Sequence, residues 1–589
     1  MNIRDFPSWL GSAMIENMRE VLEKKIKEAV EALQQGGVLP DFTVPSIQVE
    51  RPKDEQFGEY TTNAALVLAK LAKQSPMEIA ELLKGRLFDL AQSENSSFQK
   101  IEVVAPGHIN FYLPSSYFQG VVSTVLQKQY PQFPVSLVNE KVMVEYSQPN
   151  THKEFHIGHL RNVFIGSTLV NVLRKAGDEV IAANYIGDTG THIAKCLWGL
   201  VTFHGDENLD LVENKTEFLG KVYSEATQKI AENLEYEKAF RAVQKKFDSG
   251  DTALLDLWKK TKSWSMDEFE KIYTELGVSF DEYFFESIEE ESGKQLLPEL
   301  LEKGVVEKSE GAVIANLEQY GLGVLVLVRK DGGILYGLKD IPLAKKKFEK
   351  FDLDRSIYVV DVRQSLYLRQ LFKILELYGF HKKMVHCGYE FVALKGGESM
   401  SSRKGNVIPA QVLIDETIAQ VTAQFPESPN PEKIALGAIK FAMLKHGAGS
   451  KIEFDIDESV RLDGATGPYV QYAHARIVNI LAKAKEKNIS FENEPVEDRV
   501  FEEKEKDLIR EVSKFPELLL EVREGYEVHK LAHYVLHLAD RFHSFYNDCV
   551  VVDEKKTQLS SERLKLVSAV QKVLAETLAL MGISAPEKM

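Results

Sequence analysis

The chain has 589 residues, of which 44% are hydrophobic and 27% are charged, the balance of a folded globular protein. This composition excludes disorder over the whole chain, and at roughly 150 residues per domain the length indicates three or four domains. The formal net charge of −16 weighs mildly against nucleic-acid binding, although an acidic chain can still carry one basic face.

Cysteine spacing and hydrophobicity exclude further classes of protein. Cys196, Cys387 and Cys549 stand far apart with no CxxC pair, so neither a disulfide framework nor a thiolate zinc site is expected. We therefore expect no protein-bound structural metal. No apolar run approaches the ~18 residues that cross a bilayer, and the opening MNIRDFPSWLGSAM lacks the pattern of a signal peptide. We expect a cytoplasmic protein without membrane contact.

Residues 1–135 are predicted to form a small α+β domain. Residues 14–34 have the apolar spacing of an amphipathic helix. TTNAALVLAKLAKQSPMEIAELL has similar spacing and divides into two helices at its Ser-Pro pair, which is a helix start signal. FTVPSIQVERP and IEVVAPGHINFYL read as extended segments, the second with a Pro-Gly turn. The proline-bearing PQFPVSLVNE then indicates a linker.

A strand–helix–strand unit follows the linker. KVMVEYSQ, residues 141–148, is rich in β-branched and apolar residues, and residues 156–175 carry apolar side chains at helical spacing up to Gly177. EVIAANYIGD is the next strand, so this unit predicts a right-handed parallel crossover. Residues 200–300 are charge-rich and helical, as expected of an insertion.

The later segments predict the second half of an α/β sheet and then a helical domain. AVIANL, GVLVLVR, ILYGLKD, IYVVD and MVHCGYEFVAL are strand-like, with FKILELYGF as a helix between the last two. From residue 464 onward, helical patterns continue without recurring strands. We predict a multidomain chain with an α+β domain at 1–135, an α/β domain with a parallel sheet at 136–463 and an all-α helical bundle at 464–589.

The segment YSQPNTHKEFHIGHLRN carries the strongest chemical signal. His156 and His159 are spaced i, i+3 and share one face of a helix that begins just after a strand. Such a helix start offers unpaired N–H groups to an anion, Gly158 permits close approach of a flat ligand, and two imidazoles can donate to phosphate oxygens. One histidine could instead pack in the core while the other is solvated. Placement at the carboxyl end of a strand favours a ligand site.

These residues resemble a known family. HIGH at His156 to His159 is the signature of class I aminoacyl-tRNA synthetases, and the string VEYSQPNTHKEFHIGHLRNVFIGSTLVNVLRKAGDEVIAANYIGDTGTHIAK is similar to arginyl-tRNA synthetases in particular. SMSSRKGNVI, residues 399–408, resembles their mobile lysine loop. The resemblance implies a Rossmann-type catalytic core that uses ATP with Mg²⁺. By the same resemblance, ATP contacts fall on His156, Ile157, Gly158, His159, Met400, Ser401 and Ser402.

The lysine loop departs from the class-wide KMSKS motif. Ser399 and Ser402 occupy both lysine positions. The resemblance implies that Lys404, Arg403 and Lys153 supply the positive charge instead, beside His156 and His159 as catalytic residues. Many arginyl-tRNA synthetases share this variant.

Recognition of arginine requires acceptors, because a guanidinium is planar with five donors. By similarity, Tyr336, Asp340 and Gln364 match the family's side-chain recognition residues. Asp340 could also act as a helix N-cap, since Ile-Pro follows it. Tyr367 stands where the family often carries histidine, and no role is assigned to it. The positions that match contacts to the substrate's backbone groups are Glu145, Ser147 and Asn150.

The flanking segments resemble the RNA-binding domains of the same family. DGATGPYVQYAHARIVNIL, residues 463–481, is similar to the start of a helical anticodon-binding domain. FGEYTTNAALVLAK and PGHINFYL resemble the characteristic N-terminal domain, which the resemblance implies contacts the outer corner of tRNA. Residue types suited to stacking on bases or holding phosphates are Tyr469, Tyr472, His474 and Arg476, although tyrosines here could also pack in a bundle core.

The sequence thus leads to one expected activity and two alternatives. We expect an arginine–tRNA ligase that activates L-arginine with ATP and transfers it to the terminal adenosine of tRNA(Arg). We expect no DNA partner, and the resemblance implies a monomer. The alternatives are a nucleotidyltransferase of the wider HxGH superfamily that acts on a small metabolite, and a non-catalytic RNA-binding relative.

Overall fold

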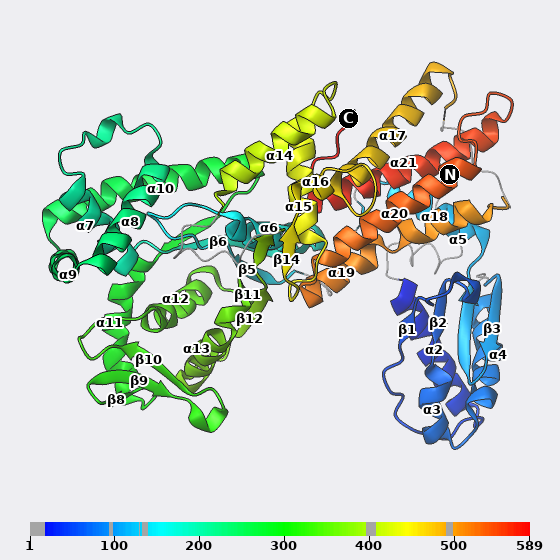
Figure 1. Ribbon diagram of the computed structural model, residues 1–589. Helices are drawn as coiled ribbons and strands as arrows, with labels where there is room; N and C mark the ends of the chain where they lie inside the picture. The colour runs from blue at the N-terminus through cyan, green and yellow to red at the C-terminus, as the bar shows by residue number, and fades with distance from the viewer. Residues whose placement is uncertain are drawn as a thin grey trace. The chain divides into compact units, whose positions relative to one another are not determined.

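The computed structural model describes residues 18–93, 98–128, 130–131, 133, 139–395, 408–490 and 499–589 (Figure 1). The chain divides into two units, which are described separately. One unit combines the described parts of residues 1–138, 473–521 and 534–577, and the other combines those of residues 139–472, 522–533 and 578–589. None of the helices in these described parts is both long and apolar enough to cross a membrane.

A five-stranded parallel sheet forms the centre of the second unit. Its strands are β5 (Lys141–Glu145), β6 (Glu179–Ile186), β7 (Glu282–Phe285), β11 (Arg355–Asp361) and β12 (Lys383–Tyr389). Their order is β12-β11-β5-β6-β7, and every neighbouring pair is parallel. The order reverses between β5 and β11, the point at which such sheets bind ligands beyond the strands' carboxyl ends. The predicted Rossmann-type sheet is confirmed.

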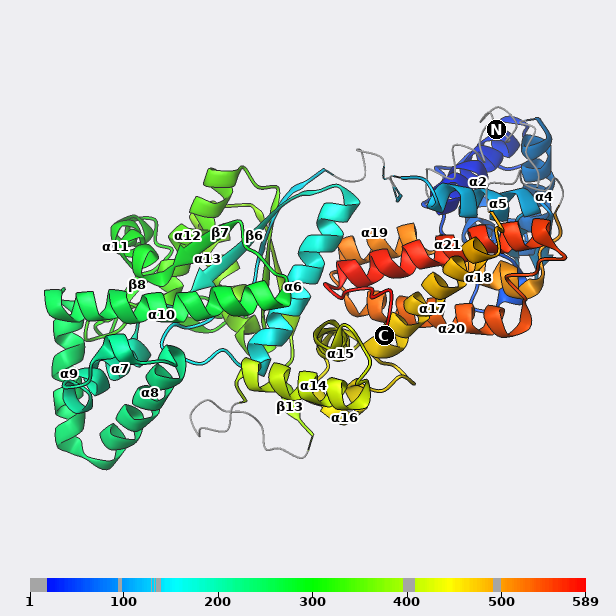
Figure 2. The ribbon, with the colours of Figure 1, turned by 90° about the horizontal axis from the view of Figure 1, so that it is seen from above.

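Helix α6 (Ile157–Ala176) makes the predicted crossover between β5 and β6. It begins after His156, which has extended backbone, and ends at Gly177, whose φ of 110° a glycine adopts without strain. Gly166 lets the helix approach the chain after β5, because a Cβ there would lie 2.2 Å from Cγ of Tyr146. Figure 2 shows α6 running alongside the sheet strands.

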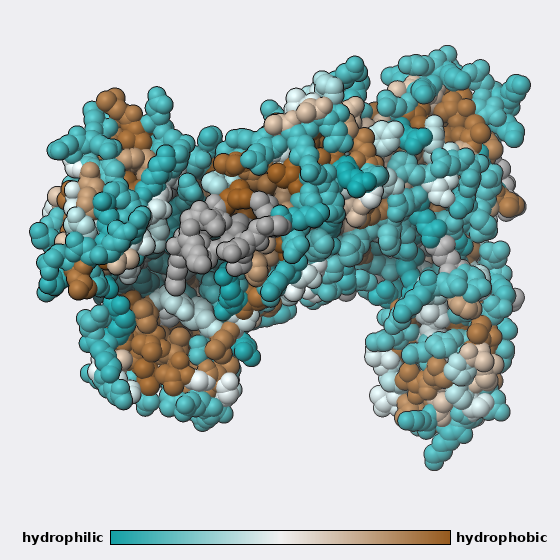
Figure 3. All heavy atoms as spheres, in the orientation of Figure 1, coloured by the Kyte–Doolittle hydropathy of each residue, from teal (hydrophilic) through white to brown (hydrophobic). Residues whose placement is uncertain are grey.

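Three segments that the sequence predicted as strands of the main sheet fold differently. AVIANL and GVLVLVR form β9 (Ala312–Asn316) and β10 (Val324–Val328), which pair in an antiparallel sheet with β8 (Glu307–Ser309). ILYGLKD is not a strand, because its last five residues begin α12 (Tyr336–Phe351). The prediction was wrong because a strand of a parallel sheet is buried on both faces, whereas Val324 and Val326 are exposed. Hydrophobic side chains gather on this part of the surface (Figure 3).

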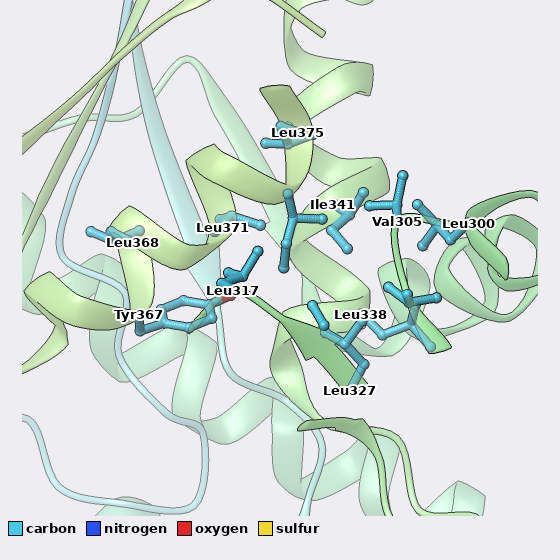
Figure 4. Packing of buried hydrophobic residues seen from close by; sticks show 14 of the residues in the cluster. Leu300, Val305, Leu317, Leu327, Leu338, Ile341, Tyr367, Leu368, Leu371 and Leu375 are labelled. Carbon is cyan, nitrogen blue, oxygen red and sulfur yellow. The ribbon is translucent and has the colours of Figure 1, made fainter. Parts of the chain in front are cut away.

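A single apolar core holds the helices beside this small sheet. It lies between α11 (Glu286–Glu302), α12, α13 (Ser365–Tyr378) and strands β9 and β10. Leu338 and Ile341 of α12 belong to the same cluster as Leu371 and Leu375 of α13, which also includes Tyr367 (Figure 4). Because these side chains are buried, the first turns of α12 and α13 are fixed relative to each other.

The predicted helical insertion is confirmed for most of its length. It comprises α7 (Thr191–Phe203), η3 (Leu209–Leu211), α8 (Lys215–Glu232), α9 (Leu234–Asp248) and α10 (Thr252–Leu276). These helices have their own apolar core, which includes Leu197, Leu219 and Trp264. The exception is β7, which lies within the insertion and yet forms an edge of the main sheet.

The remaining elements of the second unit follow the main sheet in the chain. β13 (Val392–Leu394) pairs in parallel with β14 (Ile452–Phe454), and α14 (Ala410–Gln424), α15 (Pro431–Leu444) and α16 (Ile456–Ser459) lie between or after them. The short 3-10 turns η4 (Glu318–Tyr320) and η5 (Val362–Gln364) precede β10 and α13. Helix α17 (Gly467–Glu486) begins in this unit and ends in the other.

The other unit contains the predicted α+β elements and the C-terminal helices. Strands β1 (Val49–Glu50), β2 (Tyr60–Thr62), β3 (Lys100–Val104) and β4 (His108–Tyr112) form an antiparallel sheet in the order β1-β2-β4-β3. Its early helices are α2 (Met18–Gln35), α3 (Ala64–Ala72), α4 (Pro76–Ser93) and α5 (Ser115–Val125), with η2 (Glu55–Phe57). The late helices are α18 (Glu503–Ser513), α19 (Phe515–Gly525), α20 (His529–Asp548) and α21 (Thr557–Leu580), and the last three each extend into the second unit. The predicted α+β and all-α segments are confirmed.

Candidate active site

A cavity of about 430 Å³ opens where β5 and β11 end, at the reversal of strand order. Side chains from β5, β6, β11, α12 and α13 line it, so it depends on segments more than 200 residues apart in the chain, such as Glu145 and Lys347. Of the six residues matched to arginine recognition, the lining includes Glu145, Asn150, Tyr336, Asp340 and Gln364.

Ser147 is the one member of that set outside the cavity lining. Its hydroxyl lies 2.6 Å from the hydroxyl of Tyr273 on α10, which also accepts a hydrogen bond from Asn184 at 3.0 Å. Both Ser147 and Asn184 are buried. The side chain of Ser147 therefore anchors the loop after β5 to the insertion and is turned away from the cavity.

Three carboxylates line the cavity, and two of them have a lysine partner from α12. Lys347 forms a buried ion pair with Oε2 of Glu145, whose Oε1 accepts from Gln148 at 3.2 Å. Lys339 lies 3.7 Å from Glu286, which also accepts from Thr189 at 3.1 Å. Lys347 therefore neutralises the charge of Glu145 within the protein, whereas Lys339 is shared between Glu286 and Glu290 and lies 3.1 Å from the latter.

Asp340 is the third carboxylate, and it has no cationic hydrogen-bond partner among the described residues. Its Oδ2 accepts a hydrogen bond from the hydroxyl of Tyr367, while its buried Oδ1 has no partner there. Burial raises the pKa of Asp340 to about 7. The helix begins with Leu335 as its N-cap, so the alternative of Asp340 as an N-cap is wrong. An uncompensated carboxylate oxygen suits a cationic ligand that donates hydrogen bonds.

The two histidines of HIGH are held by the backbone at the start of α6. Gly158 N–H donates to Nδ1 of His156 at 3.1 Å, and His156 N–H donates to Nδ1 of His159 at 3.1 Å. A neutral imidazole has one donor and one acceptor nitrogen. Since each Nδ1 accepts, each Nε2 carries the proton, and both rings present an Nε2–H donor.

The expectation of unpaired N–H groups at this helix start is wrong. Ile157 N–H donates to the carbonyl of Ile408 at 3.3 Å, and Gly158 N–H to His156 Nδ1. The N–H groups of His159 and Leu160 donate to the carbonyl of His156, at 2.8 and 3.3 Å. The capping residue satisfies the donors that a helix usually leaves open. Contact with an anion must therefore come from the imidazoles and nearby lysines.

Burial keeps both imidazoles neutral near pH 7. Burial, with a smaller effect from the charge of Lys153, lowers the pKa of His156 to about 4. The pKa of His159 lies well below its ordinary value for the same reason. Lys153 is half-buried, and its ammonium lies 5.6 Å from the ring centre of Tyr223 on α8. The site thus holds neutral donors with one positive charge nearby.

Most of the second signature falls outside the described residues. Met400, Ser401, Ser402, Arg403 and Lys404 lie there. The segment is described again from Ile408, where the chain pairs with the start of the first signature. Besides the contact of Ile157 with Ile408, Ala410 N–H donates to the carbonyl of Phe155 at 2.8 Å. The end of SMSSRKGNVI therefore lies directly beside HIGH.

The residues predicted for RNA contact lie on α17 with different exposures. Tyr472 is 40% exposed and Tyr469 is half-buried. Arg476 is half-buried, with its guanidinium 4.6 Å from the ring centre of Tyr546. His474 is only 4% exposed, which corrects its assignment to an RNA-contacting surface, because a buried imidazole cannot stack on a base.

The sequence reasoning missed four side chains of this site. Tyr367 was noted without a role, and Lys339, Lys347 and Tyr273 were not singled out. The lysines belong to a run of basic residues on an amphipathic helix, a pattern that usually marks a solvated face. Their burial could have been suspected only from helical spacing, since Lys339 and Lys347 lie on the face of Leu343. Among the described residues, no group of three or more His, Cys, Asp or Glu side chains is arranged to hold a metal ion.

Family models match three consecutive parts of the chain. The catalytic domain of class I tRNA synthetases (R) matches residues 121–455, the DALR anticodon binding domain matches residues 470–589, and the arginyl-tRNA synthetase N-terminal domain matches residues 20–113. The first of these ranges alone spans more than half of the 589 residues.

Relatives and solved structures agree with these matches. The chain is 32% identical to the arginine–tRNA ligase of Bdellovibrio bacteriovorus, over 98% of this chain and 99% of the relative, and 32% identical to that of Streptococcus mutans, over 97% and 100%. The arginyl-tRNA synthetase of Thermus thermophilus superposes with a TM-score of 0.78 at 28% identity, covering 97% of this chain and 100% of that one. The chain belongs to the arginyl-tRNA synthetases, the class I aminoacyl-tRNA ligases for arginine.

Proposed function

We propose that the chain performs arginine–tRNA ligation with the guanidinium of L-arginine bound to Asp340 in the cavity between β5 and β11. The observation that carries this proposal is that Oδ1 of Asp340 has no hydrogen-bond partner among the residues that the structure describes, in a cavity whose other carboxylates have lysine partners. A guanidinium supplies both the positive charge and the N–H groups that this oxygen lacks. Tyr336 and Gln364 are proposed to contact the side chain of the bound arginine, and Asn150 and Glu145 to lie toward its amino and carboxylate groups.

The first step forms arginyl-adenylate. The carboxylate of arginine attacks the α-phosphorus of ATP in line, the bond to the β-phosphate oxygen breaks, and pyrophosphate leaves. Negative charge grows on the phosphate oxygens, and the Nε2–H groups of His156 and His159 donate hydrogen bonds to them. Neutral imidazoles suit this role because they donate without proton transfer. The protein needs no nucleophile of its own, since positioning and charge stabilisation suffice.

ATP enters this reaction as its magnesium complex, with phosphate oxygens as ligands of the ion. Gly158 lets the ring of His156 lie close to the helix start, because a Cβ there would lie 3.0 Å from Cε1 of that ring. The Ile157 side chain is buried and its N–H donates to Ile408, so its proposed part in binding falls to other backbone atoms. We assign the charge that faces the pyrophosphate to Lys153, Lys404 and Arg403, of which Lys153 lies near both imidazoles. Met400, Ser401 and Ser402 complete the proposed ATP site.

The second step transfers arginine to tRNA(Arg). A terminal ribose hydroxyl, by class resemblance the 2′ group, attacks the acyl carbon of the adenylate and forms an ester. The bond from that carbon to the phosphate oxygen breaks, AMP leaves with the bonding electrons, and the hydroxyl proton passes to the departing phosphate. Exposed Tyr472 and the half-buried Tyr469 and Arg476 on α17 are proposed RNA contacts. We further propose domain boundaries at 1–135, 136–463 and 464–589, a monomer in the cytoplasm, and no DNA partner.

Aminoacylation of bulk tRNA tests the function directly. The purified chain is assayed with Mg-ATP and each standard amino acid in turn, beside pyrophosphate exchange with and without tRNA. Charging by arginine alone is expected. Charging by a different amino acid would retain the class of enzyme but remove the proposed role of Asp340. Tight tRNA binding without any charging would favour the non-catalytic alternative.

A further inference from the structure

Tyr367 donates a hydrogen bond through its hydroxyl to Oδ2 of Asp340. It lies in the first turn of α13, is 8% exposed, and belongs to the apolar core beside the cavity (Figure 4). Its ring packs edge-on against Tyr336, with centroids 4.4 Å apart and planes at 70°. Because the ring is held on several sides, the hydroxyl has a fixed position from which it donates to Oδ2.

This hydrogen bond determines which oxygen of Asp340 is left for a ligand. A carboxylate with no partner can rotate, whereas one held at Oδ2 keeps Oδ1 in one place. The hydroxyl of Tyr185 on β6 also lines the cavity without a hydrogen-bond partner among the described residues. Oδ1 and this hydroxyl are two acceptors that a planar donor fork can use together.

The hydroxyl of Tyr367 that donates to Asp340 is neutral, so it adds no charge to the cavity. Lys347 compensates Glu145, and Lys339 is shared between Glu286 and Glu290, whereas Asp340 has no lysine within ion-pair distance among the described residues and can attract a cation. A phenol hydroxyl orients Asp340 without cancelling this charge. A cationic side chain in place of Tyr367 would form an internal ion pair and close the site to a cationic substrate.

We propose that Tyr367 is a positioning residue that sets specificity for arginine, by holding Oδ2 of Asp340 so that Oδ1 meets the guanidinium of the substrate. The inference rests on the proposed function. It adds a residue that touches no reacting atom and acts through Asp340.

A pH profile separates this role from simple packing. The groups that face Asp340 are Tyr367 from α13, Lys347 and Tyr336 from α12, Glu145 from β5, Tyr185 from β6 and Glu286 from α11. Burial raises the pKa of Asp340 to about 7, and the hydroxyl of Tyr367 acts in the opposite direction. Loss of that hydroxyl therefore raises the pKa further, and the acid limb of kcat/KM for arginine moves to higher pH.

The test compares Tyr367→Phe with a matched control. Tyr378, on the same helix, donates to a carboxylate oxygen of Glu299 at 2.7 Å and lies outside the cavity lining, so Tyr378→Phe removes the same kind of bond elsewhere. Steady-state charging is measured across pH for both variants, with L-citrulline, a neutral isostere of arginine, as a competitive inhibitor. For Tyr367→Phe we expect KM for arginine to rise roughly 10-fold with a much smaller change in kcat, as for loss of a bond to a charged group. Discrimination against citrulline should fall, and Tyr378→Phe should leave both unchanged.

Dependence on Asp340 is tested by calorimetry of arginine binding to Asp340→Asn and to the double variant Asp340→Asn/Tyr367→Phe. If Tyr367 acts through Asp340, Tyr367→Phe changes affinity little once Asp340 is replaced. An unshifted pH limb with unchanged KM in folded Tyr367→Phe would overturn the inference while wild-type charging still supported the proposed function. Should Tyr367→Phe not fold, Tyr367→Met removes the hydroxyl with a more adaptable side chain and repeats the test.

Discussion

The backbone N–H of His156 donates to Nδ1 of His159 at 3.1 Å, so the first residue of HIGH fixes the tautomer of the last. The ring centres lie 3.8 Å apart. Because Gly158 fixes His156 in the same manner, the motif builds two Nε2–H donors from one helix cap. A single helix cap therefore satisfies the free backbone N–H groups and also orients the imidazole donors that are proposed to stabilise the transition state.

Asparagine replacements separate these two tasks of the histidines. In His156→Asn or His159→Asn, the amide oxygen can accept the backbone hydrogen bond in place of Nδ1, but the Nε2–H donor is lost. We expect the rate of tRNA-dependent pyrophosphate exchange to fall by about 100-fold or more, the scale of one lost oxyanion-type donor. The unfolding midpoint should change little. Near-normal exchange in either variant would contradict the donor role.

The same burial predicts how these histidines titrate. Since the pKa of His156 is lowered from 6.5 to about 4, its imidazole in the folded enzyme should stay neutral through the range where free histidine protonates. Because this pKa is lower in the folded than in the unfolded state, the histidine contributes to stability at pH values above 6.5. That contribution is lost as the pH falls from 6.5 toward about 4. Imidazole NMR should show the Nε2–H tautomer for both residues. His204 is the control, because Glu207 and Glu225 outweigh its slight burial and raise its pKa. Protonation of His156 near 6.5 would refute the burial argument.

The buried pair of Lys347 and Glu145 predicts a large effect on stability. Lys347→Met leaves the Glu145 carboxylate buried, with the amide of Gln148 as its one hydrogen-bond partner in the described part of the chain. We expect the free energy of unfolding of the catalytic unit to fall by about 3–5 kcal/mol, as measured by urea titration. The double variant Lys347→Met/Glu145→Gln should recover much of this loss, because it removes both charges. Equal stability of the single and double variants would show that the unpaired Glu145 carboxylate is not the cause of the loss.

Tyr273 predicts a role for the helical insertion at the active site. Tyr273→Phe removes the contacts with Ser147 and Asn184 that tie the loop after β5 to α10. Loss of these neutral hydrogen bonds should cost about 1–2 kcal/mol of stability and raise KM for arginine through disorder of Asn150. The control is Tyr283→Phe, since the Tyr283 hydroxyl donates to Glu270 on α10 at the exposed surface. If the two variants have the same KM, α10 does not position this loop.

Replacement of two helical glycines by alanine should change stability in opposite directions. Gly166→Ala places a Cβ 2.2 Å from Cγ of Tyr146, and Tyr146 is buried and cannot withdraw, so we expect a loss of roughly 1–3 kcal/mol or more. Gly85 lies on the exposed side of α4 with nothing within 4 Å of its added Cβ. Gly85→Ala should therefore stabilise its own unit by about 0.5–1 kcal/mol. Chemical denaturation of each variant measures both, and a neutral Gly166→Ala would show that α6 shifts freely.

The active-site motif and most elements could be predicted from local patterns. A histidine cap, apolar positions at helical spacing and a terminal Gly177 specify α6 within a stretch of neighbouring residues. The strand prediction failed for ILYGLKD because the burial of Leu338 and Ile341 against α13 decides in favour of a helix, and periodicity in a short apolar run does not separate the two. The sequence also could not show that His474 is buried, because histidine occurs both in protein cores and on surfaces.

By itself, the sequence determined the family, the order of its domains and five of the residues that line the cavity, because signature motifs and caps act between near neighbours. Only the tertiary structure decided which of those residues is available to a ligand. Glu145 and Asp340 look alike as acidic side chains, but Lys347, 202 residues from Glu145, compensates the first, and the neutral Tyr367 merely orients the second. Burial makes that difference large, since a charge removed from water depends on whatever partner the fold brings beside it.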